Sequence, residues 1–247
     1  MSDAAASGGD RLRIVVHGTG RMGRAIATAA ATQAGLELAA LVGPQAPDWE
    51  ASAPWFEELQ DLPQLPDLLI DFTLPAGTSA AAHWCAARQV PLLSGVTGLS
   101  DEVRAALFDA ARQVAVLWSP NLSLGVNLLA ELAGRAAAVL DPETPVLIED
   151  IHHRWKKDAP SGTALMLGAT IAARRAGDAA AVEYRSQREG EIIGEHTVRF
   201  RMAGETLELV HRAEDRSIYA LGALAAGRWL VQQPPALYAA RDWLASQ

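Results

Sequence analysis

The stretch Leu12-Arg-Ile-Val-Val-His-Gly-Thr-Gly-Arg-Met-Gly23 decides the fold of this chain. Residues 12–16 form an apolar run that is typical of a buried parallel strand, and the glycines after it predict a tight turn. Residues 22–34 then have the pattern of a helix, and residues 36–42 that of a second apolar strand. Two strands joined through a helix predict a right-handed βαβ unit, which begins an open parallel sheet.

Gly18, Gly20 and Gly23 have the spacing of a dinucleotide-binding motif, set between a strand and a helix. In such a motif the first glycine permits the turn and the second lets the backbone approach a pyrophosphate. The third lets the helix pack closely on the strand. The helix N-terminus adds unpaired N–H groups and a partial positive charge. We therefore expect a bound dinucleotide here, and the alternative is a glycine-rich turn that holds no ligand.

The end of the second strand bears on the choice between NADH and NADPH. An acidic residue at this point usually binds the adenosine ribose, and here the chain reads Leu41-Val42-Gly43-Pro44. Arg21 or Arg24 is in range of a 2′-phosphate, but each is equally well explained as a solvated charge on the helix. Both cofactors therefore stay open.

The pattern of predicted helices and strands changes near Asn121. Before it, strands alternate with helices, which favours a doubly wound α/β sheet; after it, runs of strands predict an α+β domain on a mixed or antiparallel sheet. Before Asn121 we expect strands at 68–72, 91–94 and 114–118, helices at 79–88 and 100–113, and a short helix at 55–59. After it we expect helices at 126–140, 162–176, 219–231 and 237–245, and strands at 145–151, 182–187, 196–203 and 205–212, with Gly204 in the last hairpin turn.

Composition narrows the class of protein. The chain has 247 residues and a formal net charge of −8, which argues against a general nucleic-acid-binding surface. Residues 1–10 are small and polar, unlike a signal peptide, and we expect them to be disordered. The absence of a long apolar run argues against a membrane span. The single cysteine, Cys85, lies in an apolar helical run and is expected to be a buried structural thiol, so we predict a soluble cytoplasmic protein.

A second informative stretch runs Glu149-Asp-Ile-His-His-Arg-Trp-Lys-Lys-Asp-Ala-Pro-Ser-Gly-Thr-Ala164. It places two His, two Lys and an Arg beside a helix start, an arrangement that suits a ligand with carboxylates. A solvated run of charges is the alternative. A metal site at His152 and His153 is disfavoured because neighbours in an extended segment point opposite ways, so we expect no metal. The isolated His17, His196 and His211 are more typical of structural residues than of catalytic ones.

Short motifs with a recognisable pattern extend over nearly the whole chain. They are Gly20-Arg-Met-Gly23, Asp71-Phe-Thr73, Gly95-Val-Thr-Gly98, Pro120-Asn-Leu-Ser-Leu-Gly-Val-Asn127, His152-His153, Lys156, Asp158-Ala-Pro-Ser-Gly-Thr-Ala164 and Gly194-Glu-His-Thr197. Taken together, they resemble the dihydrodipicolinate reductase family. The resemblance implies a Rossmann domain at 1–121, completed by C-terminal helices at 218–247, and a substrate-binding and oligomerisation domain at 122–217 that builds a homotetramer. It also implies reduction of 4-hydroxy-tetrahydrodipicolinate by NADH or NADPH in lysine and diaminopimelate biosynthesis.

The same resemblance implies a role for individual residues. His152 matches the proton donor and Lys156 the catalytic lysine. Four further residues match positions that contact a small dicarboxylate substrate: His153, Ser161, Gly162 and Thr163. The residues that match the cofactor site are Gly18, Thr19, Gly20, Arg21, Met22, Gly23, Gly95, Val96, Thr97, Ser119, Pro120, Asn121 and Leu122.

Several positions depart from the family pattern. His17 stands at the place of the first glycine of the usual turn, and Asp150 stands where Glu is usual. Trp155 and Lys157 replace a His and a small apolar residue, and the connection at 177–190 is short. These departures leave open a related dehydrogenase that acts on another imine or keto dicarboxylate. A third hypothesis is a cofactor-binding protein without catalytic activity, which the presence of both His152 and Lys156 disfavours. For Asp71, a cofactor contact and a turn or cap role are both open.

Overall fold

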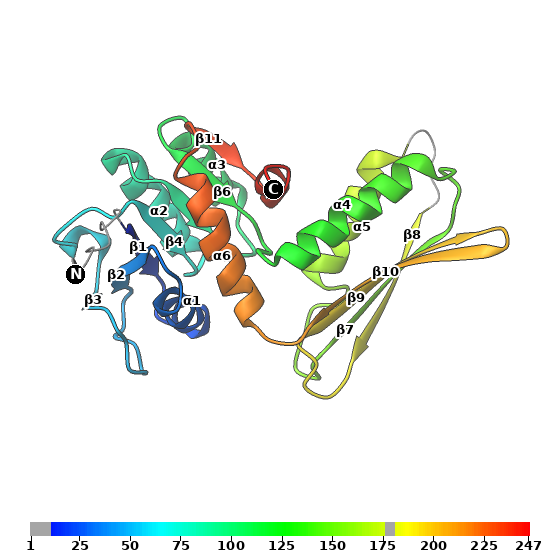
Figure 1. The fold of residues 1–247 in the computed structure, drawn as a ribbon, viewed down its shortest axis with the longest axis horizontal. Coiled ribbons are helices and arrows are strands. Elements are labelled where there is room, and N and C mark those ends of the chain that lie inside the picture. Colours follow the sequence, from blue (N-terminus) through cyan, green and yellow to red (C-terminus); the bar gives the residue numbers. More distant parts are fainter. Residues whose placement is uncertain (1–10, 176–180) are drawn as a thin grey trace, which may run out of the picture. The chain divides into compact units, whose positions relative to one another are not determined.

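The computed structural model describes residues 11–175 and 181–247 (Figure 1). The chain forms two compact units, one made of Met1–Pro120 with Tyr219–Gln247 and the other of Asn121–Ile218. The expected α/β fold with a second unit on a mixed sheet is confirmed. The start at residues 1–10, the last residue of the helix expected at 162–176 and the first part of the 177–190 connection lie outside the described residues.

The first unit is built on a parallel sheet with the strand order β11-β6-β5-β4-β1-β2-β3. Its central strands are buried along their whole length, which agrees with their continuous apolar sequences and with layers on both faces. The strands are β1 Leu12–His17, β2 Leu36–Val42, β3 Trp55–Phe56, β4 Leu68–Asp71, β5 Leu92–Ser94, β6 Ala115–Trp118 and β11 Ala236–Tyr238. The helices are α1 Arg21–Ala31, α2 Pro75–Arg88, α3 Asp101–Ala110, most of α6 Ser217–Leu230, α7 Ala240–Leu244 and the 3-10 helix Leu59–Asp61.

Local signals in the sequence explain where these helices begin. Ser100 caps α3, because its hydroxyl accepts a hydrogen bond from the N–H of Val103 at 3.4 Å. Helix α2 begins at Pro75, four residues before the predicted start, since proline loses nothing in a first turn whose N–H groups have no helical partner. Cys85 on α2 is fully buried, and burial together with nearby Asp71 raises the pKa of its thiol well above the ordinary range.

One predicted helix in the first unit was wrong, and another begins later than predicted. Residues 55–59 form the edge strand β3 and the beginning of the 3-10 helix, because the N–H of Leu41 donates to the carbonyl of Pro54 and extends the sheet. Residues 237–245 begin as β11, which pairs with β6 at the other edge before α7 starts. In both places an available sheet edge decides the conformation of a short apolar segment.

The second unit has a four-stranded sheet with the order β10-β9-β7-β8, in which β7 and β8 are parallel and the other pairs antiparallel. Helices α4 and α5 pack on one face around Ile148, Val198 and Phe200 (Figure 1). Gly204, with φ +84°, lies in the hairpin between β9 and β10, as predicted. The elements are α4 Leu124–Val139, β7 Val146–His152, α5 Gly162–Arg174, β8 Val182–Arg188, β9 Gly194–Met202 and β10 Glu205–Ala213.

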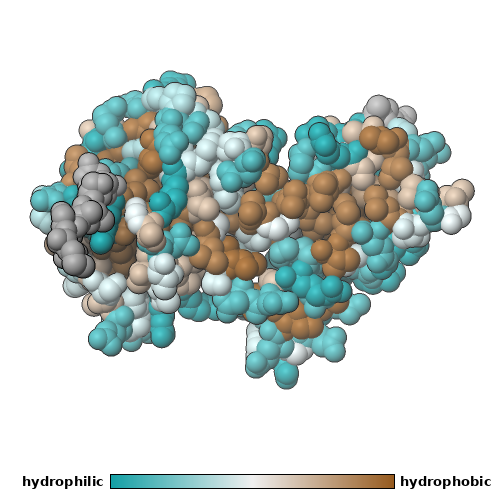
Figure 2. Space-filling view, viewed as in Figure 1, coloured by the Kyte–Doolittle hydropathy of each residue, from teal (hydrophilic) through white to brown (hydrophobic). Residues whose placement is uncertain are grey.

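The opposite face of this sheet carries charged side chains that pair across strands. Arg199 contacts Glu149 at 2.8 Å and Glu208 at 2.5 Å. Apolar surface gathers instead on the helices, where Leu128 and Leu132 of α4 are exposed and Figure 2 shows hydrophobic surface. None of the described helices is long and apolar enough to cross a membrane.

Candidate functional site

The glycine turn between β1 and α1 leaves open space above its backbone. Gly18 has φ +117°, which side chains disfavour, and a Cβ on Gly23 would lie 1.9 Å from the carbonyl oxygen of Gly18. A Cβ on Gly20 would meet no atom within 4 Å. Gly20 is also the N-cap of α1 and has no side chain to satisfy the first N–H groups of the helix. The turn therefore presents backbone donors to an open space, which fits a pyrophosphate.

The segment after β2 is tied to this turn by hydrogen bonds that the sequence did not predict. The hydroxyl of Thr19 donates to the carbonyl of Gln45 at 3.0 Å, and the indole N–H of Trp49 donates to the carbonyl of Thr19 at 3.0 Å. The indole of Trp55 donates to the carbonyl of Gly43 at 2.9 Å. The backbone that would face an adenosine ribose is thus held in place by two tryptophans, and Arg21 lies exposed beside it.

The other predicted cofactor segments of the first unit lie at the same edge of its sheet. The N–H of Gly95 donates to the carbonyl of Asp71 at 3.0 Å, and the N–H of Ser119 donates to the carbonyl of Ser94 at 3.1 Å. Because β6, β5, β4 and β1 are parallel neighbours, the loops at their carboxyl ends stand in one row. The row contains Gly18, Thr19, Gly20, Gly95, Val96, Thr97, Ser119 and Pro120, and the first turn of α1 beside it contains Arg21, Met22 and Gly23.

Two predicted cofactor residues belong to the second unit instead. Asn121 and Leu122 follow the boundary at Pro120, and both are buried. The side-chain amide of Asn121 donates to the hydroxyl of Thr163 at 3.0 Å, so it is bound to the first turn of α5.

Asp71, at the end of β4, is the buried residue that anchors this row of loops. Its carboxylate is fully buried and accepts hydrogen bonds from the hydroxyls of Thr73 at 2.6 Å, Thr78 at 2.7 Å and Ser94 at 2.9 Å. Burial alone would raise the pKa of Asp71, but His17 and the hydroxyls of Thr73 and Thr78 outweigh it and hold the pKa below its ordinary value. These contacts give Asp71 the turn and anchor role.

We expect Asp71→Ala to lower the free energy of unfolding by about 2–4 kcal/mol, because it leaves buried hydroxyls without their acceptor. The contribution of this carboxylate is present above its ordinary pKa and is lost as the pH falls through its lowered pKa, so the variant differs least from wild type in acid. Urea unfolding monitored by circular dichroism measures the change. Asp109→Ala, at an exposed position, is the control. Equal unfolding midpoints for Asp71→Ala and wild type would contradict the anchor role.

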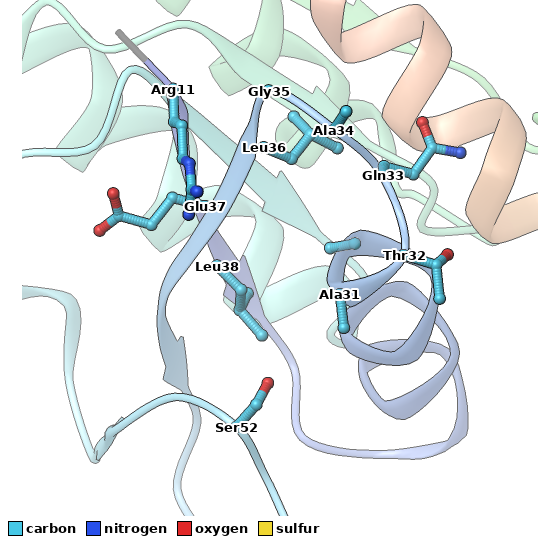
Figure 3. A pocket seen from close by; sticks show the side chains of 11 residues that line it. Arg11, Ala31, Thr32, Gln33, Ala34, Gly35, Leu36, Glu37, Leu38 and Ser52 are labelled. Atoms are coloured by element: carbon cyan, nitrogen blue, oxygen red, sulfur yellow. The ribbon is translucent and has the colours of Figure 1, made fainter. Parts of the chain in front are cut away.

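The pocket drawn in Figure 3 lies elsewhere on the first unit. It has a volume of about 630 Å³ and is lined by residues from the end of α1 to the beginning of β2, with Arg11 and Ser52. This is the amino end of β2, whereas the row of loops stands at the carboxyl ends. The pocket contains none of the predicted site residues.

In the second unit, β7 and the start of α5 bring the predicted catalytic and substrate residues together. His152 is the last residue of β7 and is 8% exposed, with Nδ1 3.0 Å from Asp150 Oδ1. Lys156 Nζ lies in the next loop, 2.9 Å from Asp158 Oδ1. Ser161 caps α5, since its hydroxyl accepts from the N–H of Ala164 at 3.1 Å.

The start of α5 has room for a ligand. A Cβ on Gly162 would meet no atom within 4 Å, so the first turn of the helix is open at this residue. The side chain of Asp158 lies near this helix start. Its pKa is lowered, because the ammonium of Lys156 and the backbone N–H of Gly162 stabilise its negative charge against the effect of burial. A protein carboxylate thus lies where a cation and a helix N-terminus both favour negative charge.

The histidines of this unit differ in environment. Burial and the positive charge of Lys156 lower the pKa of His152, while Asp150 opposes them. Burial and the nearby His152 lower the pKa of His196 to about 3, so His196 is neutral at physiological pH. Its ring stands edge-on to His152 at a centroid distance of 5.1 Å, and its Nε2 lies 3.2 Å from the hydroxyl of Ser161. His153 packs against Trp155, with ring centroids 5.8 Å apart.

Sequence reasoning missed Ser186 and Arg188, which contact Asp150 from β8, and it interpreted His196, whose ring contacts His152, only as a structural residue. It noted Asp150 only as a departure from the family pattern. The alternation of side chains along a strand was the available signal, because residues 150 and 152 share one face of β7. Within the described ranges 11–175 and 181–247, no group of three or more His, Cys, Asp and Glu residues is arranged to hold a metal ion.

Two family models match the chain. Residues 12–122 match the one described as dihydrodipicolinate reductase, N-terminus, and residues 125–244 match dihydrodipicolinate reductase, C-terminus. The chain is 44% identical over 236 residues to the 4-hydroxy-tetrahydrodipicolinate reductase of Xanthomonas euvesicatoria, which covers 94% of this chain and 97% of the relative. It is 45% identical over 239 residues to the 4-hydroxy-tetrahydrodipicolinate reductase of Stenotrophomonas maltophilia, with coverage of 94% and 98%.

Solved structures agree in fold. The dipicolinate-bound dihydrodipicolinate reductase from Paenisporosarcina sp. TG-14 superimposes with a TM-score of 0.80 at 23% identity, covering 93% of this chain and 97% of that one. GenD2 from gentamicin A biosynthesis, in complex with NAD, superimposes with a TM-score of 0.61 at 14% identity, covering 94% and 88%.

Proposed function

The chain belongs to the dihydrodipicolinate reductase family, and we propose that the residues described above carry out the reaction of that family. The reaction is the reduction of 4-hydroxy-tetrahydrodipicolinate to tetrahydrodipicolinate by NADH or NADPH, in lysine and diaminopimelate biosynthesis. The observation that carries the assignment of residues is the juxtaposition of His152, Lys156 and the capped start of α5 in one unit.

The first unit is proposed to hold the cofactor. The open space over Gly20, the unpaired N–H groups at the start of α1 and the row of loops at the carboxyl ends of the strands all fit a dinucleotide. NADH or NADPH supplies the hydride when bound. Gly43 at the end of β2 neither repels a 2′-phosphate nor binds the ribose hydroxyls with a carboxylate, which supports the use of both cofactors.

The second unit is proposed to hold the dicarboxylate. One carboxylate would accept hydrogen bonds from the N–H of Gly162 and from Thr163, in the field of the helix N-terminus. His153 and the ammonium of Lys156 would add donors nearby. Asp158 now pairs with Lys156 and would have to yield part of that contact to the substrate.

His152 is proposed to supply the proton that accompanies hydride addition to the conjugated system, which the substrate forms as its 4-hydroxyl leaves as water. Its Nδ1 is bound to Asp150, so Nε2 is the atom from which a proton can leave. The two negative charges of the substrate raise the tendency of His152 to be protonated, which offsets its burial. Lys156 stabilises negative charge that develops during the reaction.

The activity is tested by following NADH and NADPH oxidation with substrate generated by the preceding synthase. We expect oxidation with both cofactors, and none with a panel of other imines and keto diacids. The panel matters because Trp155, 63% exposed next to His153, departs from the family pattern. Enzyme that binds cofactor and oxidises none of it with the synthase product would refute the assignment.

Gly162→Asp is expected to raise the substrate KM at least about 10-fold with little change in protein stability. An added carboxylate at the first residue of α5 repels the substrate by about 1–4 kcal/mol, depending on solvent exposure. The same charge is favourable for the helix N-terminus, and the side chain meets open space, so the fold tolerates it. Steady-state kinetics and thermal unfolding measure the two effects. Gly162→Asn is the uncharged control of nearly equal size, and an equal KM for both variants would contradict a carboxylate at this place.

We also propose a cytoplasmic homotetramer that acts without nucleic acid or membrane. Support comes from Val210 of β10, an exposed apolar residue on the sheet face away from α4 and α5, at a position that a second copy can cover. Native mass spectrometry is expected to give four times the 26.2 kDa of one chain, and a monomer at micromolar concentration would contradict the proposal.

A further inference from the structure

We propose that Asp150 is the positioning residue of the substrate site, holding the imidazole of His152 with one carboxylate oxygen and the start of α5 with the other. The inference rests on the proposed function only in taking His152 as the proton donor. It adds a residue that contacts neither substrate nor cofactor and acts through His152 and Ser161.

Each carboxylate oxygen of Asp150 has its own set of hydrogen-bond partners. Oδ1 lies 3.0 Å from Nδ1 of His152 and accepts from the guanidinium of Arg188 at 2.9 Å. Oδ2 accepts from the hydroxyl of Ser186 at 2.6 Å and from the backbone N–H of Ser161 at 3.3 Å. The side chain is fully buried, so water does not replace any of these partners. A single carboxylate therefore joins the end of β7, the strand β8 and the N-cap of α5.

Asp150 is ionised, and this determines the tautomer of His152. Burial would raise the pKa of Asp150, but Ser186, Ser161 and Arg188 outweigh it and keep the pKa below its ordinary value. A carboxylate only accepts hydrogen bonds, so Nδ1 of His152 must carry a proton. Neutral His152 then has a bare Nε2, and protonated His152 gives up its proton from Nε2.

Gly194 leaves room at that nitrogen. A Cβ at residue 194 would lie 3.1 Å from Nε2 of His152, which is tighter than most side-chain contacts. The Gly194-Glu-His-Thr197 segment thus places a glycine beside the proton-donating atom and His196 against the ring of His152.

The charged groups around His152 come from several elements. Lys156 in the loop and Arg188 on β8 lower the pKa of His152, and Asp150 on β7 raises it. His196 on β9 is neutral, with a pKa of about 3, and burial lowers the pKa of His211 behind it on β10. Without the charge of Asp150, the cations and the burial act on His152 unopposed.

The test compares Asp150→Asn, Asp150→Glu and Glu149→Gln. Glu149 is the matched control, because it is the neighbouring carboxylate on β7, it is also ion-paired, and its partners Arg185 and Arg199 lie on the other face of the sheet. The first measurement is the ¹⁵N spectrum of the histidines across pH, with the His152 signals assigned from the spectrum of His152→Ala. We expect the Nδ1–H tautomer in wild type and in Glu149→Gln, and a growing share of the Nε2–H tautomer with a lower His152 pKa in Asp150→Asn.

The second measurement is the pH profile of kcat/KM. We expect Asp150→Asn to reduce kcat at least about 10-fold, as for other residues that orient a histidine, and to move the falling limb to lower pH. Asp150→Glu should restore both in part, because it keeps the charge and the acceptor. A purely structural role would lower stability without moving the limb or the tautomer.

The outcomes separate this inference from the proposed function. Near-wild-type rates in His152→Ala would refute the donor role of His152 while leaving the tautomer shift as a test of Asp150. An Nε2–H tautomer in the wild-type protein would overturn the inference with no variant at all, so a failure of Asp150→Asn to fold leaves it testable. An unchanged tautomer and an unchanged pH limb in folded Asp150→Asn would also overturn it.

Discussion

Turnover is expected to fall at least about 100-fold in His152→Ala and in Lys156→Ala, the low end for the loss of a group that supplies a proton or stabilises developing charge. His152 is placed at the end of β7 with Nδ1 bound to Asp150, and Lys156 follows in the loop that leads to α5. Because the cofactor turn lies in the other unit, cofactor affinity should be unchanged in both variants. Steady-state kinetics with saturating NADPH, together with a fluorescence titration of NADPH, measure the two quantities.

Lys157→Ala is the matched control for Lys156→Ala, since Lys157 is the adjacent and exposed cation. Its turnover should stay near that of wild type. If both His152→Ala and Lys156→Ala turned over at nearly the wild-type rate, the roles proposed for these residues would be wrong. An equal loss in Lys157→Ala would indicate that the net charge of the loop matters rather than the position of one ammonium.

The pH dependence provides an independent check of His152. Burial and Lys156 hold the pKa of His152 below its ordinary value of 6.5 in the free enzyme, against the effect of Asp150. A proton donor must be protonated, and kcat/KM reports the free enzyme, so kcat/KM should fall as the pH rises through this lowered pKa. His152→Ala should lose that limb, and a profile that rises with pH in the same range would contradict the donor role.

Gly23→Ala is expected to weaken NADH and NADPH binding about 10- to 100-fold. The added Cβ would lie 1.9 Å from the carbonyl oxygen of Gly18 and 2.9 Å from its carbonyl carbon. Because both of these atoms belong to the backbone, α1 must move away from the turn. Overpacking of this kind costs about 1–3 kcal/mol, and each 1.4 kcal/mol changes a dissociation constant tenfold. Fluorescence titration measures binding without any need for activity.

Gly20→Ala distinguishes the turn from the ligand. Its Cβ meets no protein atom, so thermal stability should equal that of wild type, while the approach of a pyrophosphate to the backbone is obstructed. Gly23→Ala should lower both stability and binding. Wild-type affinity in both variants would mean that the dinucleotide does not use this turn.

Much of the fold and part of the site follow from local sequence. The first strand, the glycine turn and the capped start of α5 at Ser161 appear where the sequence predicts them, and the helix expected at 22–34 is present at Arg21–Ala31. The failures lie at 55–59 and at the start of the helix expected at 237–245, where short segments joined the edges of the sheet as β3 and β11 before α7 began. A segment of a few residues has no periodicity long enough to distinguish a strand from a helix.

The sequence by itself determined the parallel first sheet, the glycine turn and the stretch Glu149–Ala164 with its capped helix start at Ser161. These depend on periodicity, capping and spacing, all of which act within a few residues. Only the tertiary structure decided that Asp150 joins Ser186 and Arg188, 36 and 38 residues away, to His152 and Ser161. The physical reason is strand register: which side chains meet across β7, β8 and β9 depends on the pairing of distant segments, and a change of one residue would point each side chain to the other face.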